Sequence, residues 1–224
     1  MLQKNDEALT HSWLDGALAR FATDNDALVL QTRSVLARVV PDAPRHARLL
    51  NTLSMLEHIG SHKIMSTQHA ADIDQPTLKH VAEEAQHAYF MKRQAEKTAA
   101  QPLEYVDAAL LAPAAARMYF QRLEAAMVRT LARRRSSRAV YLYMSMIVEF
   151  RALWFYGLYQ QTLQRLRHSL SLKRVLGEER NHLSEMANRL ETAGELSETR
   201  TAELLACERA LYSRLLGALQ RAVA

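Results

Sequence analysis

The sequence predicts an all-α fold, and two observations carry the prediction. The first is the scarcity of turn residues, since only 6 glycines and 5 prolines occur among 224 residues, whereas sheet folds rich in tight turns need more of both. The second is the helical spacing of apolar residues in the segments described below. The sequence also lacks a glycine-rich phosphate loop, and its single cysteine, Cys207, excludes disulfides and four-cysteine metal sites within one chain.

Residues 6–40 are predicted to form two short helices. Asn5 is the expected cap of the first and Asp26 of the second, because short polar side chains accept hydrogen bonds from the free N–H groups at a helix start. Pro41 should end the second helix. Apolar residues at helical spacing are expected to form the buried faces of these helices: Leu14, Leu18, Phe21, Val29, Leu36 and Val40.

Two longer helices should follow. One is expected from about Pro44 to Ile64 with Asp42 as its cap, and the other from near Pro76 to about Thr98, since proline is favoured in the first helical turn. A polar stretch connects them. Residues 100–113 should be irregular, because they contain two prolines.

The second half of the chain begins with a predicted helix over residues 114–135. Ser136 and Ser137 are expected to interrupt it and to cap a strongly apolar helix that extends to about residue 160. Because that helix is apolar nearly all round, it should lie at the centre of the fold.

A turn within residues 161–170 should lead to the next helix, with Ser169 or Ser171 as its cap and Gly194 at its end. Ser197 is then expected to cap the last helix. Four leucines form an apolar stripe along that helix: Leu204, Leu211, Leu215 and Leu219.

The chain is expected to form a single helical domain over 1–224, with N-terminal helices in 1–41, a core in 42–196 and a C-terminal helix in 197–224. Its longest apolar run has nine residues, 108–116, which is too short to span a bilayer, and the N-terminus lacks the apolar stretch of a signal peptide. We therefore expect a cytoplasmic protein without membrane association. The net charge of +5 permits acidic partners, but no nucleic-acid partner is expected without more basic stripes.

Two Glu-x-x-His motifs carry the candidate chemistry. Glu84 and His87 form one, and Glu179 and His182 form the other. Residues three apart share a helical face, so each motif can present a carboxylate and an imidazole to one metal ion. One such match is weak support, since chance alone produces about 0.6 of them in a chain with this content of Glu and His.

A lone glutamate on the preceding predicted helix accompanies each motif. Glu57 lies 27 residues before Glu84, and Glu149 lies 30 residues before Glu179. In an antiparallel helix hairpin, Glu57 and Glu84 would lie almost level. The two halves of the chain therefore repeat one pattern, as a pseudo-twofold metal site requires.

Burial gives the physical reason to expect metal. Glu149 lies in the most apolar predicted helix, where an unpaired carboxylate would cost on the order of several kcal/mol or would take up a proton. Arg151 is two positions away and points to another face. Two divalent cations would neutralise four buried carboxylates. The alternative is a metal-free bundle held by buried salt bridges, in which the motifs occur by chance.

With these residues, the segment 44–194 resembles the ferritin-like di-iron carboxylate superfamily, in which two helices each supply one Glu and two others each supply Glu-x-x-His. The resemblance implies a ferritin-like four-helix bundle with extra N-terminal, crossover and C-terminal helices. It also implies two iron ions per chain, or alternatively manganese, with Glu84 and Glu179 bridging them. Six residues are the implied metal ligands: Glu57, Glu84, His87, Glu149, Glu179 and His182.

The resemblance further implies a non-haem di-iron oxidoreductase, an oxygenase or oxidase, that uses O₂ on a small apolar organic substrate. An external electron donor and a homodimeric assembly fit this function. Small residues one turn from the ligands would leave room for O₂ and substrate: Gly60, Ser61, Ala88 and Ala152. The alternatives are a ferroxidase or iron-storage protein, a manganese catalase, and a helical interaction protein that keeps the motifs for structure.

Residues beside the six ligands are assigned other roles. Tyr156 lies two turns after Glu149 and is expected to be a core tyrosine, with a radical site or a hydrogen-bond donor to the metal pocket as the alternatives. Glu83 and Glu178 are expected to face solvent or to support the neighbouring ligands. His80 is expected at an ordinary polar helix position, with support of the ligands as the alternative.

Overall fold

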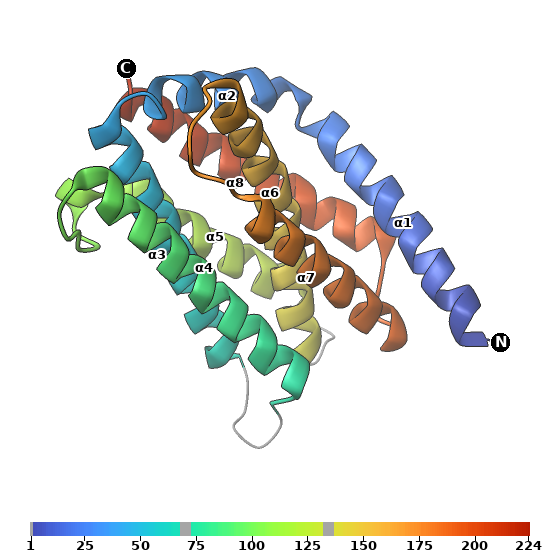
Figure 1. Ribbon diagram of the computed structural model, residues 1–224. Helices are drawn as coiled ribbons and strands as arrows, with labels where there is room; N and C mark the ends of the chain where they lie inside the picture. The colour runs from blue at the N-terminus through green and yellow to red at the C-terminus, as the bar shows by residue number, and fades with distance from the viewer. Residues whose placement is uncertain (1, 68–72, 132–136) are drawn as a thin grey trace.

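The computed structural model describes the backbone of residues 2–67, 73–131 and 137–224, and the side chains of residues 13–67, 73–131 and 139–224. Every regular element in these ranges is helical (Figure 1), which confirms the predicted all-α class. The elements are α1 (Leu2–Asp24), α2 (Asp26–Val39), α3 (Ala43–Ser66), α4 (Gln75–Ala99), the 3₁₀ turn η1 (Asp107–Ala109), α5 (Pro113–Leu131), α6 (Ser137–Arg165), α7 (Lys173–Thr192) and α8 (Glu198–Ala222).

The two predicted caps in the N-terminal part of the chain are wrong. Helix α1 already includes Asn5, and the residue that precedes α2 is Asn25 rather than Asp26. Asn25 does not cap α2 with its side chain, because its Oδ1 accepts a hydrogen bond from Arg151 Nη2 at 2.7 Å, while its Nδ2 donates to the Phe21 carbonyl oxygen. The end of α2 before Pro41 agrees with the prediction.

Helix boundaries around the site follow the predicted capping signals. Asp42 Oδ1 accepts a hydrogen bond from the Arg45 N–H at 3.0 Å at the start of α3. Ser197 Oγ likewise accepts from the Arg200 N–H at the start of α8. Gly194 follows α7 with φ +65°, a left-handed conformation that glycine adopts without steric cost.

The connection between α6 and α7 covers residues 166–172 and overlaps the predicted turn. Neither serine occupies the capping position of α7, although Ser171 Oγ accepts from the Lys173 N–H at 3.5 Å. The capping position is Leu172, which is fully buried, and its N–H donates to Gln160 Oε1 at 2.6 Å. Core packing of Leu172 therefore sets the start of α7, in place of the predicted caps Ser169 and Ser171.

The helix over 114–135 is predicted correctly in position, since α5 spans Pro113–Leu131. Residues 132–136 lie outside the described part of the chain, as does the side chain of Ser137. The predicted capping of α6 by Ser136 and Ser137 therefore falls outside the described residues.

Helix α6 lies at the centre of the fold, as its apolar sequence predicts. It contacts α1, α2, α5, α7 and α8. Four of its aromatic side chains are fully buried: Tyr141, Tyr143, Phe150 and Tyr159. The core therefore forms around α6.

Two helix hairpins position the candidate site (Figure 1). Helix α3 packs along α4, α6 packs along α7, and α4 meets α7 where the two hairpins face each other. Helix α5 crosses outside these hairpins and packs against α8, α3 and α6. It thus forms an outer wall beside the site.

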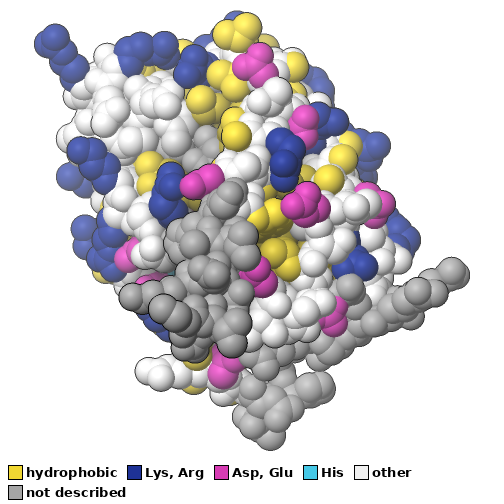
Figure 2. All heavy atoms as spheres, turned by 90° about the vertical axis from the view of Figure 1, so that its right-hand side faces the viewer, with side chains coloured by type: hydrophobic (Ala, Val, Ile, Leu, Met, Phe, Trp, Pro, Cys, Tyr) yellow, Lys and Arg dark blue, Asp and Glu magenta, His cyan; other side chains and the backbone are white. Residues whose placement is uncertain are grey.

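The molecular surface in Figure 2 carries basic and acidic side chains interspersed, with small groups of hydrophobic side chains between them. Within the described ranges, no helix combines the length and the hydrophobicity needed to cross a membrane.

Candidate metal centre

The structure brings all six sequence-predicted residues together between the two hairpins. Glu57 comes from α3, Glu84 and His87 from α4, Glu149 from α6, and Glu179 and His182 from α7. Five of them are buried, with side chains that have almost no access to solvent. Glu57 is half-buried and lines a cavity.

Two groups of four residues could each hold a metal ion. One group consists of His80, Glu84, Glu149 and His182, and the other of Glu57, Glu84, His87 and Glu179. Within each group, one candidate ligand atom from every residue lies within 4.8 Å of the others. Glu84 belongs to both groups, so its carboxylate lies between them.

The carboxylates of Glu84 and Glu179 each face both motif histidines. Glu179 Oε1 lies 3.3 Å from His87 Nδ1, and Glu179 Oε2 lies 3.2 Å from His182 Nδ1. Glu84 Oε1 lies 3.3 Å from His182 Nδ1 and 3.7 Å from His87 Nδ1. Both carboxylates therefore lie between the two motif histidines, and Glu84 is the one that belongs to both groups.

Three atoms at the centre of this cluster are buried without a hydrogen-bond partner among the described residues. They are Glu84 Oε1, Glu179 Oε1 and His87 Nδ1. Buried polar atoms without partners are costly and rare in native proteins. Oxygen and imidazole nitrogen atoms are also the donor types that iron and manganese accept. The residues present therefore fit a bound cation.

The outer nitrogen atoms of the two motif histidines are held by glutamates from the opposite hairpin. His87 Nε2 on α4 lies 2.8 Å from Glu178 Oε2 on α7, and His182 Nε2 on α7 lies 2.9 Å from Glu83 Oε2 on α4. Ionised carboxylates only accept, so each Nε2 is the donor. Each Nδ1 consequently faces the centre, as in metal sites where a carboxylate orients the ligating histidine.

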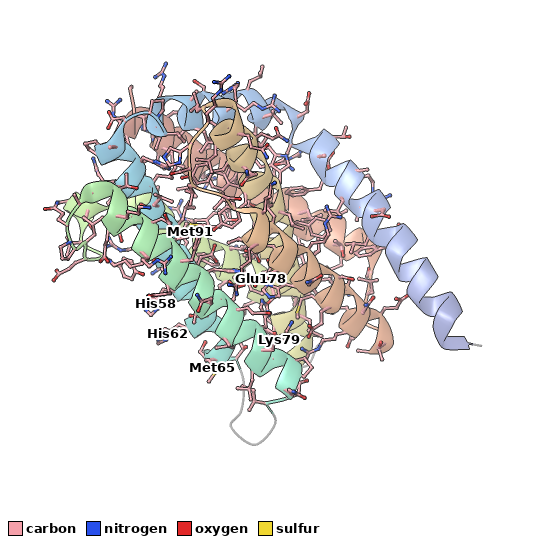
Figure 3. The ribbon with its side chains drawn as sticks, viewed as in Figure 1. His58, His62, Met65, Lys79, Met91 and Glu178 are labelled. Atoms are coloured by element: carbon pink, nitrogen blue, oxygen red, sulfur yellow. The ribbon has the colours of Figure 1, made fainter. Side chains whose placement is uncertain are left out.

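Glu178 points from α7 toward α4 (Figure 3). Burial alone would raise the pKa of Glu178, but hydrogen bonds from Arg174 and His87 lower it below its ordinary value. On α4, Glu83 pairs with Lys79 at 3.3 Å. Each supporting glutamate is therefore held in turn by a basic residue one helical turn away, and the support of the ligands predicted for Glu83 and Glu178 agrees with these contacts.

His80 was expected at an ordinary polar helix position, and this prediction is wrong. Its side chain is buried within the cluster. Its Nε2 lies 3.2 Å from Glu149 Oε1 and 3.6 Å from Glu84 Oε1. Its Nδ1 lies 3.0 Å from the Tyr141 hydroxyl. His80 lies four residues before Glu84 and seven before His87, so all three share one face of α4. This spacing is the feature of the sequence that indicates a place for His80 in the cluster.

Tyr156 is both a core residue and a hydrogen-bond donor to the cluster. Its side chain is buried, and its hydroxyl donates to Glu57 Oε1. Burial and the neighbouring Glu57 carboxylate raise the pKa of Tyr156 well above its ordinary value. The hydroxyl therefore keeps its proton at neutral pH.

The buried charges shift the pKa values of the acidic and basic groups in opposite directions. The pKa values of Glu57 and Glu149 are both raised. In each case burial is the main cause, and the nearby carboxylates Glu84 and Glu179 add to it. Burial opposes the charging of the imidazoles, but interactions with Glu179 and Glu84 outweigh it and raise the pKa of His87 to about 10 and that of His182 to about 11. Protons on these two imidazoles balance part of the negative charge before a cation binds.

Arg151 is turned away from the cluster, as its position in the sequence predicts. It pairs with Glu208 on α8 through Nη2 at 2.7 Å, and Asn25 Oδ1 accepts from the same nitrogen at 2.7 Å. The Arg151 guanidinium also lies over the ring of Tyr212. The carboxylates of the cluster therefore receive no ion pair from Arg151.

Two apolar cavities border the cluster on different sides. The larger, of about 150 Å³, lies between α3, α5 and α6 and reaches His80, Glu84 and Glu149. The smaller, of about 90 Å³, reaches Glu57 and Tyr156. Small molecules in either cavity would lie directly beside candidate metal ligands.

His58 and His62 on α3 lie apart from these groups (Figure 3). Both are exposed, and their ring centroids are 4.9 Å apart.

Comparisons with protein-family models, curated proteins and solved structures found no match to this chain. Inferences about its activity therefore rest on the geometry and chemistry of the site itself.

Proposed function

We propose that this protein is a ferritin-like, non-haem di-iron oxidoreductase that uses O₂ to oxidise a small apolar organic molecule. The observation that carries the proposal is the buried cluster in which Glu84 belongs to two potential metal sites and three inward-facing atoms lack a hydrogen-bond partner. Four carboxylates and three imidazoles meet there. Such a set of hard oxygen and imidazole donors favours iron, with manganese as the alternative.

Two cations would be held in unequal surroundings. Two histidines and two glutamates form one potential site, whereas one histidine and three glutamates form the other. Two divalent cations would balance the four glutamate charges. Reduced iron in these sites would supply electrons for the activation of O₂, and an external electron donor would restore them after each turnover.

The residues around the cluster have separate tasks in this proposal. Glu83 and Glu178 orient the two motif histidines so that each Nδ1 faces inward. Tyr156 holds its proton on the hydroxyl that donates to Glu57. The apolar walls of the two cavities exclude water and thereby strengthen the electrostatic interactions at the centre.

The apolar cavities favour an organic substrate over ferrous iron as the molecule oxidised. A hydrated cation that travels through an apolar passage loses its water ligands without replacement, which is costly. Iron storage would need a polar route for many ions. The lining of the larger cavity instead includes Ile64, Phe120 and Met127.

Measurement of O₂ uptake tests the proposed function. Protein loaded anaerobically with ferrous iron should consume O₂, and uptake should increase with a suitable apolar compound and reductant, whereas a Glu84→Ala variant should do neither. Uptake that depends only on the amount of added ferrous iron would indicate a ferroxidase. Rapid decomposition of H₂O₂ by the manganese-loaded protein, without O₂ uptake by the iron-loaded form, would indicate a catalase.

A further inference from the structure

The larger cavity has the form of a binding site for one small ring. Its volume of about 150 Å³ matches that of an apolar protein cavity known to hold a single benzene molecule. Most of its lining surface is apolar, with a few polar side chains among the lining residues. Ligand pockets in proteins commonly have this composition.

The inner end of the cavity opens onto one of the two potential metal sites. His80, Glu84 and Glu149 line it there. Gly60 on α3 keeps this end open, since a Cβ atom at residue 60 would lie 3.6 Å from Glu84 Oε2. Any larger side chain at this position would extend into the space beside the carboxylate.

The outer end of the cavity lies between α3 and α5. Lys63 on α3 forms an ion pair with Glu124 on α5, and Val128 in the same wall is 46% exposed. Because Lys63 and Glu124 neutralise each other, they offer no net charge to an arriving molecule. A neutral ligand therefore suits the cavity better than an ion.

Phe120 and Val148 line both cavities and thus stand between them. The smaller cavity has a volume of about 90 Å³ and reaches the other end of the cluster at Glu57. The volume of the larger space matches a ring-sized molecule more closely. The two sides of the cluster are therefore not equivalent for a ligand.

We infer that the larger cavity binds the organic substrate, and that this substrate is a neutral, monocyclic molecule of about six to eight non-hydrogen atoms placed against His80, Glu84 and Glu149. This inference rests on the proposed function for the oxidation itself. Occupancy of the cavity by an apolar ring does not require oxidation and is tested separately.

Fluorobenzene is the probe, observed by ¹⁹F NMR titration of the purified protein. It should bind saturably to the wild type, and at least tenfold more weakly to Gly60→Leu and to Ser145→Leu, which fill the larger cavity. Ala152→Leu is the matched control, because Ala152 lies on α6 like Ser145 but lines the smaller cavity. The control should bind fluorobenzene as the wild type does.

A second measurement locates the ligand relative to the metal. Paramagnetic Mn²⁺ in the cluster should raise the ¹⁹F relaxation rate of bound fluorobenzene several-fold over Zn²⁺-loaded protein, and Gly60→Leu should abolish the increase. Helical circular dichroism verifies that each variant is folded, and two independent filling variants keep the test valid if one is not.

The possible outcomes separate the two proposals. Protein that binds no metal contradicts the proposed function. Metal-loaded protein that fails to bind fluorobenzene, binds it equally well after the larger cavity is filled, or loses it in Ala152→Leu overturns the substrate site alone.

Discussion

Glu83 Oε2 on α4 lies 2.9 Å from His182 Nε2 on α7, across the gap between the two helix hairpins. Glu178 and His87 form the reverse pair between the same two helices. Each glutamate directly precedes the motif glutamate of its own helix but supports the histidine of the other. This crossed arrangement fixes both histidines with each Nδ1 toward the centre.

Removal of a supporting carboxylate should weaken metal binding without abolishing it. Glu83→Gln and Glu178→Gln are each expected to lower metal affinity by about 10- to 100-fold, because the amide holds the imidazole less strongly in the required orientation. Competition with a metal-binding indicator measures the change. Glu203→Gln, an exposed position on α8, is the control and should retain the wild-type affinity, whereas equal affinity in all three variants would contradict the supporting role.

Loss of the Glu84 carboxylate should lower the metal content more than loss of a residue that belongs to only one of the two potential sites. Glu84→Ala is expected to remove both cations, because Glu84 belongs to both potential sites. Glu57→Ala and His80→Ala should each leave about one cation per chain, because each residue belongs to a single group. Elemental analysis of the purified variants distinguishes these results, and full metal content in Glu84→Ala would refute its bridging role.

Metal affinity should rise with pH. The pKa values of about 10 for His87 and about 11 for His182 mean that both imidazoles are protonated at pH 7 before a cation binds. The cation must displace these protons, so affinity should increase between pH 6 and pH 8 by about tenfold per pH unit for each proton released. Calorimetry in buffers of different ionisation enthalpy counts the protons, and pH-independent affinity over this range would contradict the assignment.

Stability should depend on the buried ion pair between Arg151 and Glu208. Arg151→Met is expected to lower the free energy of unfolding by about 3–5 kcal/mol, because it leaves the buried Glu208 carboxylate without its ion-pair partner, although the Tyr119 hydroxyl still donates to it. The double variant Arg151→Met/Glu208→Leu should recover much of this loss. Urea denaturation measures both, and a double variant less stable than Arg151→Met would show that the pair is not the source of the effect.

Capping signals in the sequence predicted helix boundaries well where the capping side chain is free to turn toward its own helix. Asp42 and Ser197 behave in this way. The predictions failed at the starts of α2 and α7, where the capping positions are Asn25 and Leu172. Long-range packing decides there, because Arg151, 126 residues away, donates to Asn25 and because Leu172 is fully buried. Such contacts are not visible in local sequence.

The six candidate ligands could be identified from spacing because each pair lies within one helix or one hairpin. The contribution of His80 could not be decided in this way. Its spacing to Glu84 was visible, but its burial depends on the contacts of α4 with α6, including Tyr141 at a separation of 61 residues. The crossed pairing of Glu83 with His182 likewise depends on how two hairpins meet, 99 residues apart in the chain.

The metal content per chain, measured by inductively coupled plasma mass spectrometry on freshly purified protein, shows whether the cluster holds two metal ions. About two iron or manganese ions per chain are expected. Fewer than about 0.2 ions per chain, persisting after reconstitution with ferrous iron, would contradict it and would leave the cluster as a buried network of hydrogen bonds and ion pairs.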